Sequence, residues 1–281
     1  VQICEACYEF CRPKIIIIAT NGLLDSKIAR DTRKIVETCS DSSVIVNLSL
    51  DGIGEQHDDL RGVPGNFQKV MSTFNLLKEA KKEFSNLDVG LHSVVSKFNI
   101  DQLTALYSFV HALNPDSYIC EYAENRSELF NKNSDIAPPL VKYEVFLRDL
   151  SSKVKRDYLE KSAGIPKLIQ AFRLTYYDFV LRVLKERRQV LPCYAGFISC
   201  GISPYGDVWP CAIQAYDAIL GNLREVDYNL ERVWKSPRAD NVRETIKLGQ
   251  CYCPLANAYY TNALCNSSAM LKILPQILLP R

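Results

Sequence analysis

Residues 193–211 read CYAGFISCGISPYGDVWPC, a run with cysteines on both sides of a Pro-Tyr-Gly-Asp turn. Alternating apolar residues, among them Ile202 and Val208, flank the turn and predict a tight β-hairpin. Such a hairpin would bring the thiols of Cys193 and Cys211 towards each other. What these two thiols bind is therefore the first question that the sequence raises about function.

A second cysteine-rich run lies further along, where residues 250–265 read QCYCPLANAYYTNALC. Cys251 and Cys253 are one residue apart, so in extended backbone their side chains point the same way. Four thiolates that converge from two segments are what a tetrahedral metal ion or an iron–sulfur cluster requires. We therefore expect Cys193, Cys211, Cys251 and Cys253 to be metal ligands.

The other cysteines leave alternatives open. Cys200 lies on the same hairpin and is either a core residue or a substitute ligand, and Cys265 can supply a further ligand. The trio of Cys4, Cys7 and Cys11 has a spacing that resembles a cluster motif, but the same spacing puts all three on one face of a helix, and we predict a helical core there. Cys39 and Cys120, which stand in or next to apolar segments, are predicted to be structural.

Composition excludes several classes of function. Of the 281 residues, 47% are hydrophobic and 23% are charged, and the net charge of +2 is too small to indicate a nucleic-acid or anionic-membrane partner. No apolar run approaches the roughly 20 residues that span a bilayer, and the N-terminus does not resemble a secretory signal. We expect a cytoplasmic protein, in which clustered cysteines favour metal binding over disulfides.

Strands and helices alternate along the first part of the chain. The predicted strands are Lys14–Ala19, Ser43–Leu50, Leu87–Val95 and Asp116–Tyr122, and helical spacing is seen at Gln2–Cys11, Leu23–Glu37, from a cap at Asn66, and at Asn99–Leu113. Each strand is apolar enough to be covered on both faces. This pattern predicts an α/β fold with a parallel sheet and right-handed crossovers, most of a barrel that lacks its first unit.

Three parts are expected in the chain. Residues 1–130 form the partial barrel, residues 131–190 a helical linker with long helices at Leu140–Val154 and Ile165–Arg188, and residues 191–281 a small cysteine-rich α+β domain. That last part would have a thin hydrophobic core by itself, and a bound cluster would compensate for it.

Polar residues gather at the predicted carboxyl ends of the strands, where α/β sheets place their chemistry. They are Thr20, Asn21, Ser49, Asp51, His92, Ser93, Ser96, Glu121, Glu124, Asn125 and Arg126. Their common position indicates a ligand-binding rim, although polar strand-to-helix turns occur in any α/β protein.

In chain order, the runs IIIIATNGLL, VIVNLSLDGIGEQHDDLRG, GLHSVVSKFN and the cysteine hairpin resemble a radical S-adenosylmethionine (SAM) enzyme with a C-terminal SPASM or Twitch auxiliary-cluster domain. The resemblance covers nearly the whole chain. The spacing from Cys193 through Gly206 to Cys211 fits the opening of that domain, and SLDG followed by HDDLRG is a second marker.

The resemblance implies a partial (β/α)6 TIM-like barrel for SAM and a [4Fe–4S] cluster, with at least one auxiliary [4Fe–4S] cluster in the C-terminal domain. In the family the barrel cluster reduces SAM to a 5′-deoxyadenosyl radical, which abstracts a hydrogen atom from a peptide or small-molecule precursor. A reductant such as a flavodoxin or ferredoxin is implied as a partner. By motif position, Thr20, Asn21 and Ser93 would contact SAM and Asp51 the substrate. Arg126, one of the polar residues at the strand ends, is a further candidate for substrate binding.

Two departures from the family pattern matter. The CxxxCxxC loop that holds the radical-generating cluster and the GGEP run are both missing, so we expect an N-terminally truncated copy that cannot make the radical by itself. After the hairpin, CYC is followed by eleven residues before Cys265, which favours a single auxiliary cluster. The alternative function is a non-catalytic interaction module that binds zinc or an iron–sulfur cluster.

Overall fold

A computed structural model describes residues 1–161 and 164–278, which belong to two compact units, Val1–Glu121 and Tyr122–Arg281. No helix in these ranges is both long enough and apolar enough to cross a membrane. The sequence pattern also predicts a last helix at Ser267–Leu279; this helix is observed as Ser267–Leu278, and Leu279 lies outside the described residues.

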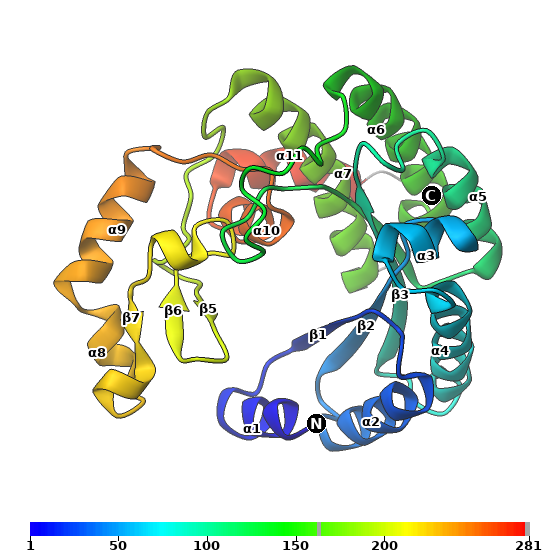
Figure 1. Cartoon of the computed structure of the whole chain (residues 1–281), viewed down its shortest axis with the longest axis horizontal. Coiled ribbons are helices and arrows are strands. Elements are labelled where there is room, and N and C mark those ends of the chain that lie inside the picture. Colours follow the sequence, from blue (N-terminus) through cyan, green and yellow to red (C-terminus); the bar gives the residue numbers. More distant parts are fainter. Residues whose placement is uncertain (162–163, 279–281) are drawn as a thin grey trace. The chain divides into compact units, whose positions relative to one another are not determined.

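The first unit is built on a four-stranded sheet whose order follows the sequence (Figure 1). Its strands are β1 (Ile15–Thr20), β2 (Ser43–Ser49), β3 (Leu87–Val95) and β4 (Ser117–Tyr122). β1 pairs with β2 and β2 with β3 in parallel, so the predicted parallel α/β sheet is confirmed. All four strands lie within one residue of their predicted bounds.

The helices of this unit are α1 (Gln2–Cys11), α2 (Asp25–Thr38), α3 (Glu55–Arg61), α4 (Asn66–Lys81) and α5 (Leu103–Leu113). Sequence periodicity missed α3 because its seven residues are too few for a clear apolar repeat. α5 begins later than the predicted Asn99, since the preceding residues form turns.

Side-chain alternation divides the sheet into a covered face and an open face. On β2, Val44, Val46 and Leu48 are fully buried, and α4 packs against both β2 and β3. The residues of β1 that point the other way are open, with Ile15 43% and Ile17 64% exposed. Ligand-binding side chains are therefore to be sought on the open face and at the carboxyl ends of the strands.

The start of α4 corrects the prediction that Asn66 caps it. Asn66 is the first helical residue and its side chain makes no cap hydrogen bond. The carboxylate of Asp58 accepts hydrogen bonds from the backbone N–H groups of Gly65 (2.6 Å) and Phe67 (2.7 Å) instead. Asp58 therefore satisfies free N–H groups at the start of α4 from the neighbouring helix α3.

The N-terminal cysteines also depart from expectation. Gln2–Cys11 is a helix, as predicted, but none of its residues is buried, and Cys7 and Cys11 are exposed. The core prediction was wrong because, within the described residues, this helix packs only lightly, against α2. Cys39 and Cys120 are fully buried, in agreement with the structural role predicted for them.

The second unit contains long helices and a small sheet. Its main helices are α6 (Leu140–Val154), α7 (Gly164–Glu186), α8 (Leu230–Trp234), α9 (Pro237–Lys247), α10 (Ala256–Leu264) and α11 (Ser267–Leu278), with a π-helical turn at Lys155–Leu159. Its strands are β5 (Gly201–Ile202), β6 (Asp207–Trp209) and β7 (Gly221–Asn222). Short 3-10 turns lie at Ala215–Asp217 and Leu223–Val226.

The predicted hairpin is confirmed: β5 and β6 pair antiparallel, and β7 adds to β6. Ser203 closes the turn, because its hydroxyl oxygen accepts hydrogen bonds from the N–H groups of Tyr205 (3.2 Å) and Asp207 (3.0 Å). Gly206 has a φ of +90°, which a residue with a side chain would adopt only with strain. The Pro-Tyr-Gly-Asp sequence thus suits the turn that it forms.

Candidate functional site: a strand-end network and a thiol cluster

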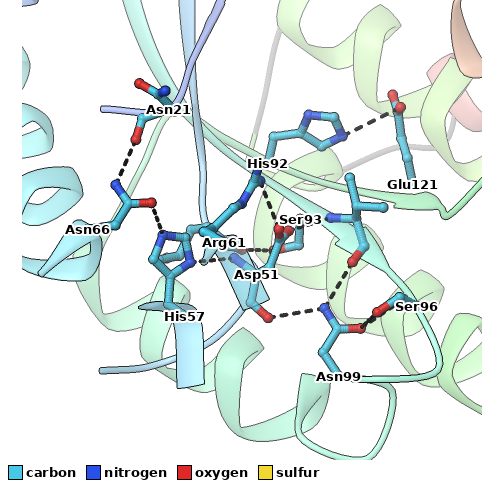
Figure 2. A network of polar contacts seen from close by, with 12 residues as sticks. Asn21, Asp51, His57, Arg61, Asn66, His92, Ser93, Ser96, Asn99 and Glu121 are labelled. Atoms are coloured by element: carbon cyan, nitrogen blue, oxygen red, sulfur yellow. Dashed lines mark hydrogen bonds and ion pairs between the residues drawn. The ribbon is translucent and has the colours of Figure 1, made fainter. Parts of the chain in front are cut away.

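Asp51, at the carboxyl end of β2, holds several backbone segments together (Figure 2). One carboxylate oxygen accepts a hydrogen bond from the N–H of Val94 (2.7 Å), and the other pairs with the guanidinium of Arg61 (2.7 Å). Its carbonyl accepts from the side-chain amide of Asn99 (3.0 Å). Both carboxylate oxygens of this predicted substrate residue thus have partners within the protein, and Arg61 extends the group.

A chain of hydrogen bonds joins Asp51 to the turn after β1 (Figure 2). The N–H of Asp51 donates to Nδ1 of His57 (3.1 Å), so the other ring nitrogen, Nε2, carries the proton and donates to Oδ1 of Asn66 (3.1 Å). The side-chain amide of Asn66 then donates to the carbonyl of Asn21 (3.1 Å). Burial, the largest influence, lowers the pKa of His57 and keeps the ring neutral.

The other two residues predicted to contact SAM differ in accessibility. The hydroxyl of Thr20 accepts a hydrogen bond from the N–H of Gly22 (3.3 Å) and remains half-buried. Ser93 is fully buried and donates to the carbonyl of Leu50, with its oxygen also 2.8 Å from the hydroxyl of Tyr118. Ser93 therefore braces neighbouring strand ends and is closed to a ligand in this conformation.

His92, the neighbour of Ser93, points to the opposite face of the sheet, because side chains alternate along a strand. Its Nε2 lies 3.5 Å from a carboxylate oxygen of Glu121 on β4 (Figure 2). Both side chains are partly accessible, at 23% and 18% exposure. A carboxylate-oriented imidazole therefore lies on the open side of the sheet.

Arg126, the second predicted substrate residue, lies in the second unit. Its guanidinium contacts the carboxylate of Glu124 at 2.9 Å, and its backbone N–H donates to the side chain of Asn131 (2.7 Å). Glu124 acts electrostatically on Cys253, so this ion pair belongs to the surroundings of the thiols.

The four cysteines predicted as ligands come together in the second unit. The charge of Cys193 raises the pKa of each of the other three thiols. The charge of Cys251 also raises the pKa of Cys211. A small cavity of about 30 Å³ is lined by Cys193, Cys251 and Cys253 and by apolar residues that include Phe179, Val190 and Leu191. We call this space the thiol cavity.

Burial dominates the acid–base properties of these thiols. It raises the pKa of Cys211 to about 11 and that of Cys253 well above its ordinary value, and it also raises the pKa of Cys251. Neighbouring thiolates repel one another, which raises these values further. A bound cation would reverse this balance, because metal coordination stabilises the thiolate form.

The donor set suits an iron–sulfur cluster or zinc, both of which take four thiolates. In residues 1–161 and 164–278, no three His, Cys, Asp or Glu side chains adopt a ready-made metal-binding arrangement. The thiols therefore converge without forming a closed coordination sphere, and the fit rests on their number, chemistry and mutual electrostatic influence.

Neighbouring elements position the two cysteine segments. The side-chain oxygen of Asn262 on α10 accepts a hydrogen bond from the N–H of Tyr194 (2.8 Å), directly after Cys193. The hydroxyl of Tyr176 on α7 donates to the carbonyl of Pro254 (3.0 Å), directly after Cys253. Arg243 on α9 donates from Nε to the carbonyl of Gly196 (2.7 Å) and stacks over Trp234, 4.7 Å from its ring centre.

The two uncertain cysteines differ from these four. Burial alone raises the pKa of Cys200, which packs against the small core of Val208, Leu220, Val233 and Ala239. Cys265 is exposed at the end of α10. Neither is among the thiols that shift the pKa of Cys211, Cys251 or Cys253.

Comparison with known proteins identifies the class of the thiol region. Residues 193–254 match the SPASM family, an iron–sulfur cluster-binding domain, and the match begins at the first of the four cysteines and ends just after the last. The hairpin and the Cys251–Cys253 loop thus form one recognisable domain.

Two curated relatives resemble most of the chain. AlbA, the antilisterial bacteriocin subtilosin biosynthesis protein of Bacillus subtilis (strain 168), is 25% identical over 80% of this chain and 43% of its own length. The AdoMet-dependent heme synthase of Methanosarcina barkeri (strain Fusaro / DSM 804) is 23% identical over 79% of this chain and 60% of its own. The chain therefore spans roughly half the length of these relatives.

Solved structures support the fold. Native anSMEcpe with bound AdoMet and Cp18Cys peptide has a TM-score of 0.55 at 15% identity, covering 92% of this chain and 73% of that one. The complex with Kp18Cys peptide has a TM-score of 0.52 at 18% identity, covering 82% and 59%. The SPASM match and the two relatives together support a protein of the radical SAM/SPASM type.

Sequence inspection missed the residues that organise the strand ends, namely His57, Arg61, Asn66 and Asn99. Their partners are brought to them by the fold, since His57 and Asn66 act between the ends of β1 and β2. The run HDDLRG at 57–62, shortly after SLDG at 49–52, was the one local signal, because it places a histidine and an arginine on a short segment close to Asp51 in the sequence.

Proposed function

We propose that this chain is part of a radical SAM enzyme whose SPASM domain binds one auxiliary [4Fe–4S] cluster through Cys193, Cys211, Cys251 and Cys253. The observation that carries the proposal is that all four cysteines lie inside residues 193–254, which match an iron–sulfur cluster-binding domain, and that Cys193, Cys251 and Cys253 line one cavity. Such a cluster supplies a redox centre, and the protein supplies its position and excludes water from it.

The reaction proposed for the whole protein is reductive cleavage of SAM, followed by radical modification of a peptide or a small-molecule precursor. The relative named for bacteriocin biosynthesis and the neighbours with bound peptides favour a peptide. The barrel motif CxxxCxxC is not found in the 281 residues, so the activity is proposed for the complete enzyme. A flavodoxin or ferredoxin is proposed as the reductant.

The sheet and its helices are proposed to be part of a (β/α)6 barrel. Residues 1–130 would belong to it, residues 131–190 would link it to the SPASM domain, and residues 191–281 would hold the cluster. The order of the four strands supports the barrel part of this proposal.

Roles at the strand ends follow from accessibility. Thr20 and Asn21 are proposed to contact SAM directly, whereas buried Ser93 would act by holding the strand ends in place. Asp51 would act on the substrate indirectly, by positioning the guanidinium of Arg61, with which it is paired. Arg126, paired with Glu124 in the second unit, remains a proposed substrate-binding residue.

The test is anaerobic reconstitution of the 281-residue chain with iron and sulfide. The proposal expects a brown protein with about four iron and four sulfide per chain, as a [4Fe–4S] cluster requires. A colourless protein that retains one tightly bound zinc ion would overturn it and support the alternative, a zinc-binding interaction module. Metal analysis of protein purified without added iron gives an independent reading.

A further inference from the structure

A second, larger cavity lies in the same unit as the thiols and has no assigned role. It measures about 770 Å³ and is bounded by α7, α11, the start of the hairpin segment and Tyr259 of α10. Sites for small molecules typically measure about 300–1,000 Å³. We call this space the α7–α11 cavity, and it is large enough for a small organic ligand.

Two opposite charges in its lining have no hydrogen-bond or ion-pair partner among the described residues. Asp178 on α7 and Lys272 on α11 influence each other electrostatically, yet neither makes a hydrogen bond or an ion pair with any described residue. Both side chains are exposed enough for a ligand to reach them.

The other charges of the lining are already satisfied. Arg182 pairs with Glu186 (3.0 Å), and Lys185 pairs with Glu144 (2.7 Å). The cavity therefore offers one carboxylate and one ammonium group for a ligand, and its complement is a zwitterion rather than an anion or a cation.

The remaining walls are partly apolar. Phe179, Val190 and Leu191 line both the α7–α11 cavity and the thiol cavity. An apolar side chain of a ligand would bury surface against them, at the wall nearest to Cys193 and Cys251. The two cavities thus share a wall.

We propose that the α7–α11 cavity binds a zwitterionic amino compound of amino-acid or dipeptide size, with its ammonium group at Asp178, its carboxylate at Lys272 and an apolar side chain against Phe179 and Leu191. This ligand site is separate from the cluster site of the proposed function. It does not need a bound cluster, so its failure would leave the iron and sulfide analysis untouched.

The experiment is isothermal titration calorimetry of the whole chain with three probes: L-leucyl-L-phenylalanine, its N-acetyl derivative and its C-terminal amide. Loss of one charge-assisted hydrogen bond should weaken binding about fivefold to tenfold, so each blocked probe is expected to bind that much less tightly than the free dipeptide.

Two variants assign the charges. In Asp178→Asn the free and N-acetylated dipeptides should bind equally, while the preference for a free carboxylate remains. In Lys272→Gln the free acid and the amide should bind equally, while the preference for a free amine remains. The controls Asp227→Asn and Lys247→Gln change exposed residues outside the cavity and should bind as the wild type does.

Absence of dipeptide binding to the wild type would overturn the proposal, as would equal affinity for all three probes. The proposal would also fail if each variant weakened the binding of all three probes by the same factor, because that result indicates a change in the shape of the cavity. Far-ultraviolet circular dichroism of each variant checks that the helices are retained.

Discussion

The backbone N–H of Asp51 donates a hydrogen bond to Nδ1 of His57 over 3.1 Å, which places the ring proton on Nε2. His57 is fully buried, and through Asn66 it connects the end of β2 with the turn after β1. A neutral imidazole thus ties together two segments at which a ligand is proposed to bind.

This relationship predicts a pH dependence of stability. Burial lowers the pKa of His57 in the folded state, whereas the unfolded chain has an ordinary value of about 6.5. As the pH is lowered below about 6.5, the unfolded chain binds a proton at this histidine while the folded chain does not. The free energy of unfolding therefore decreases as the pH is lowered, until the folded-state pKa is reached. Hydrogen exchange of peptides covering 43–61, corrected for the intrinsic pH dependence of exchange, should show protection that decreases as the pH is lowered through about 6.5 towards the folded-state pKa.

The matched variant is His57→Gln, which removes the titrating ring and keeps an amide that can donate and accept. Its first unit should be less stable at neutral pH by about 1–3 kcal/mol, since a buried hydrogen bond is disturbed. The acid-induced loss of protection should shrink. If wild type and variant lost protection in parallel, His57 would not be the group responsible.

Asp58 is predicted to stabilise α4 from the neighbouring helix. Asp58→Ala removes the acceptor for the N–H groups of Gly65 and Phe67 and should cost about 1–2 kcal/mol, as loss of a helix cap does. Asp59→Ala, at the exposed adjacent position, should cost less than about 0.5 kcal/mol. Urea unfolding followed by circular dichroism compares the two, and equal costs would contradict the capping role.

Gly90 is predicted to be required by close packing within the sheet. A Cβ at this position would lie 2.2 Å from the side-chain oxygen of Asn47 and 2.6 Å from the hydroxyl of Ser117. Gly90→Ala should therefore destabilise the first unit by about 1–3 kcal/mol, the usual cost of overpacking. Adding Asn47→Ala removes the nearest atom and should recover part of the loss in thermal unfolding. A double variant less stable than the sum of the single ones would refute the steric explanation.

Arg243 is predicted to hold the loop that follows Cys193. Arg243→Gln loses the hydrogen bond to the carbonyl of Gly196 and the stacking on Trp234, at a cost of about 1–3 kcal/mol. Both tryptophans of the chain, Trp209 and Trp234, lie in the second unit, so urea unfolding followed by tryptophan fluorescence reports on this unit. Arg238→Gln, on the same helix but exposed, is the control and should change little.

The sheet could be predicted from sequence because each strand is a continuous apolar run ended by turn residues. The helices α3 and α10 could not, since the first has only seven residues and the second lies in a run whose cysteines and proline suggest a loop. The trio of Cys4, Cys7 and Cys11 shows a further limit. Periodicity indicates that residues share a helical face, but it does not tell whether another element covers that face.

At the candidate sites, sequence indicated which residues belong together better than it indicated their geometry. The spacing of Cys193, Cys211, Cys251 and Cys253 suggests one ligand set, and their role as ligands of one cluster stays a prediction. The accessibility of Ser93 was not visible in the sequence, because its burial depends on the distant partner Tyr118. The role of His57 likewise depends on Asn66 and Asn21, which only the fold brings to it.

The central claim is that four named thiols hold one iron–sulfur cluster, and iron analysis of reconstituted cysteine variants tests it most directly. The wild type and the exposed-cysteine control Cys11→Ser should each bind about four iron per chain. Cys193→Ala, Cys211→Ala, Cys251→Ala and Cys253→Ala should each lose most of that iron and the brown colour. Full iron content in any two of these four variants, or zinc in place of iron in the wild type, would contradict the account.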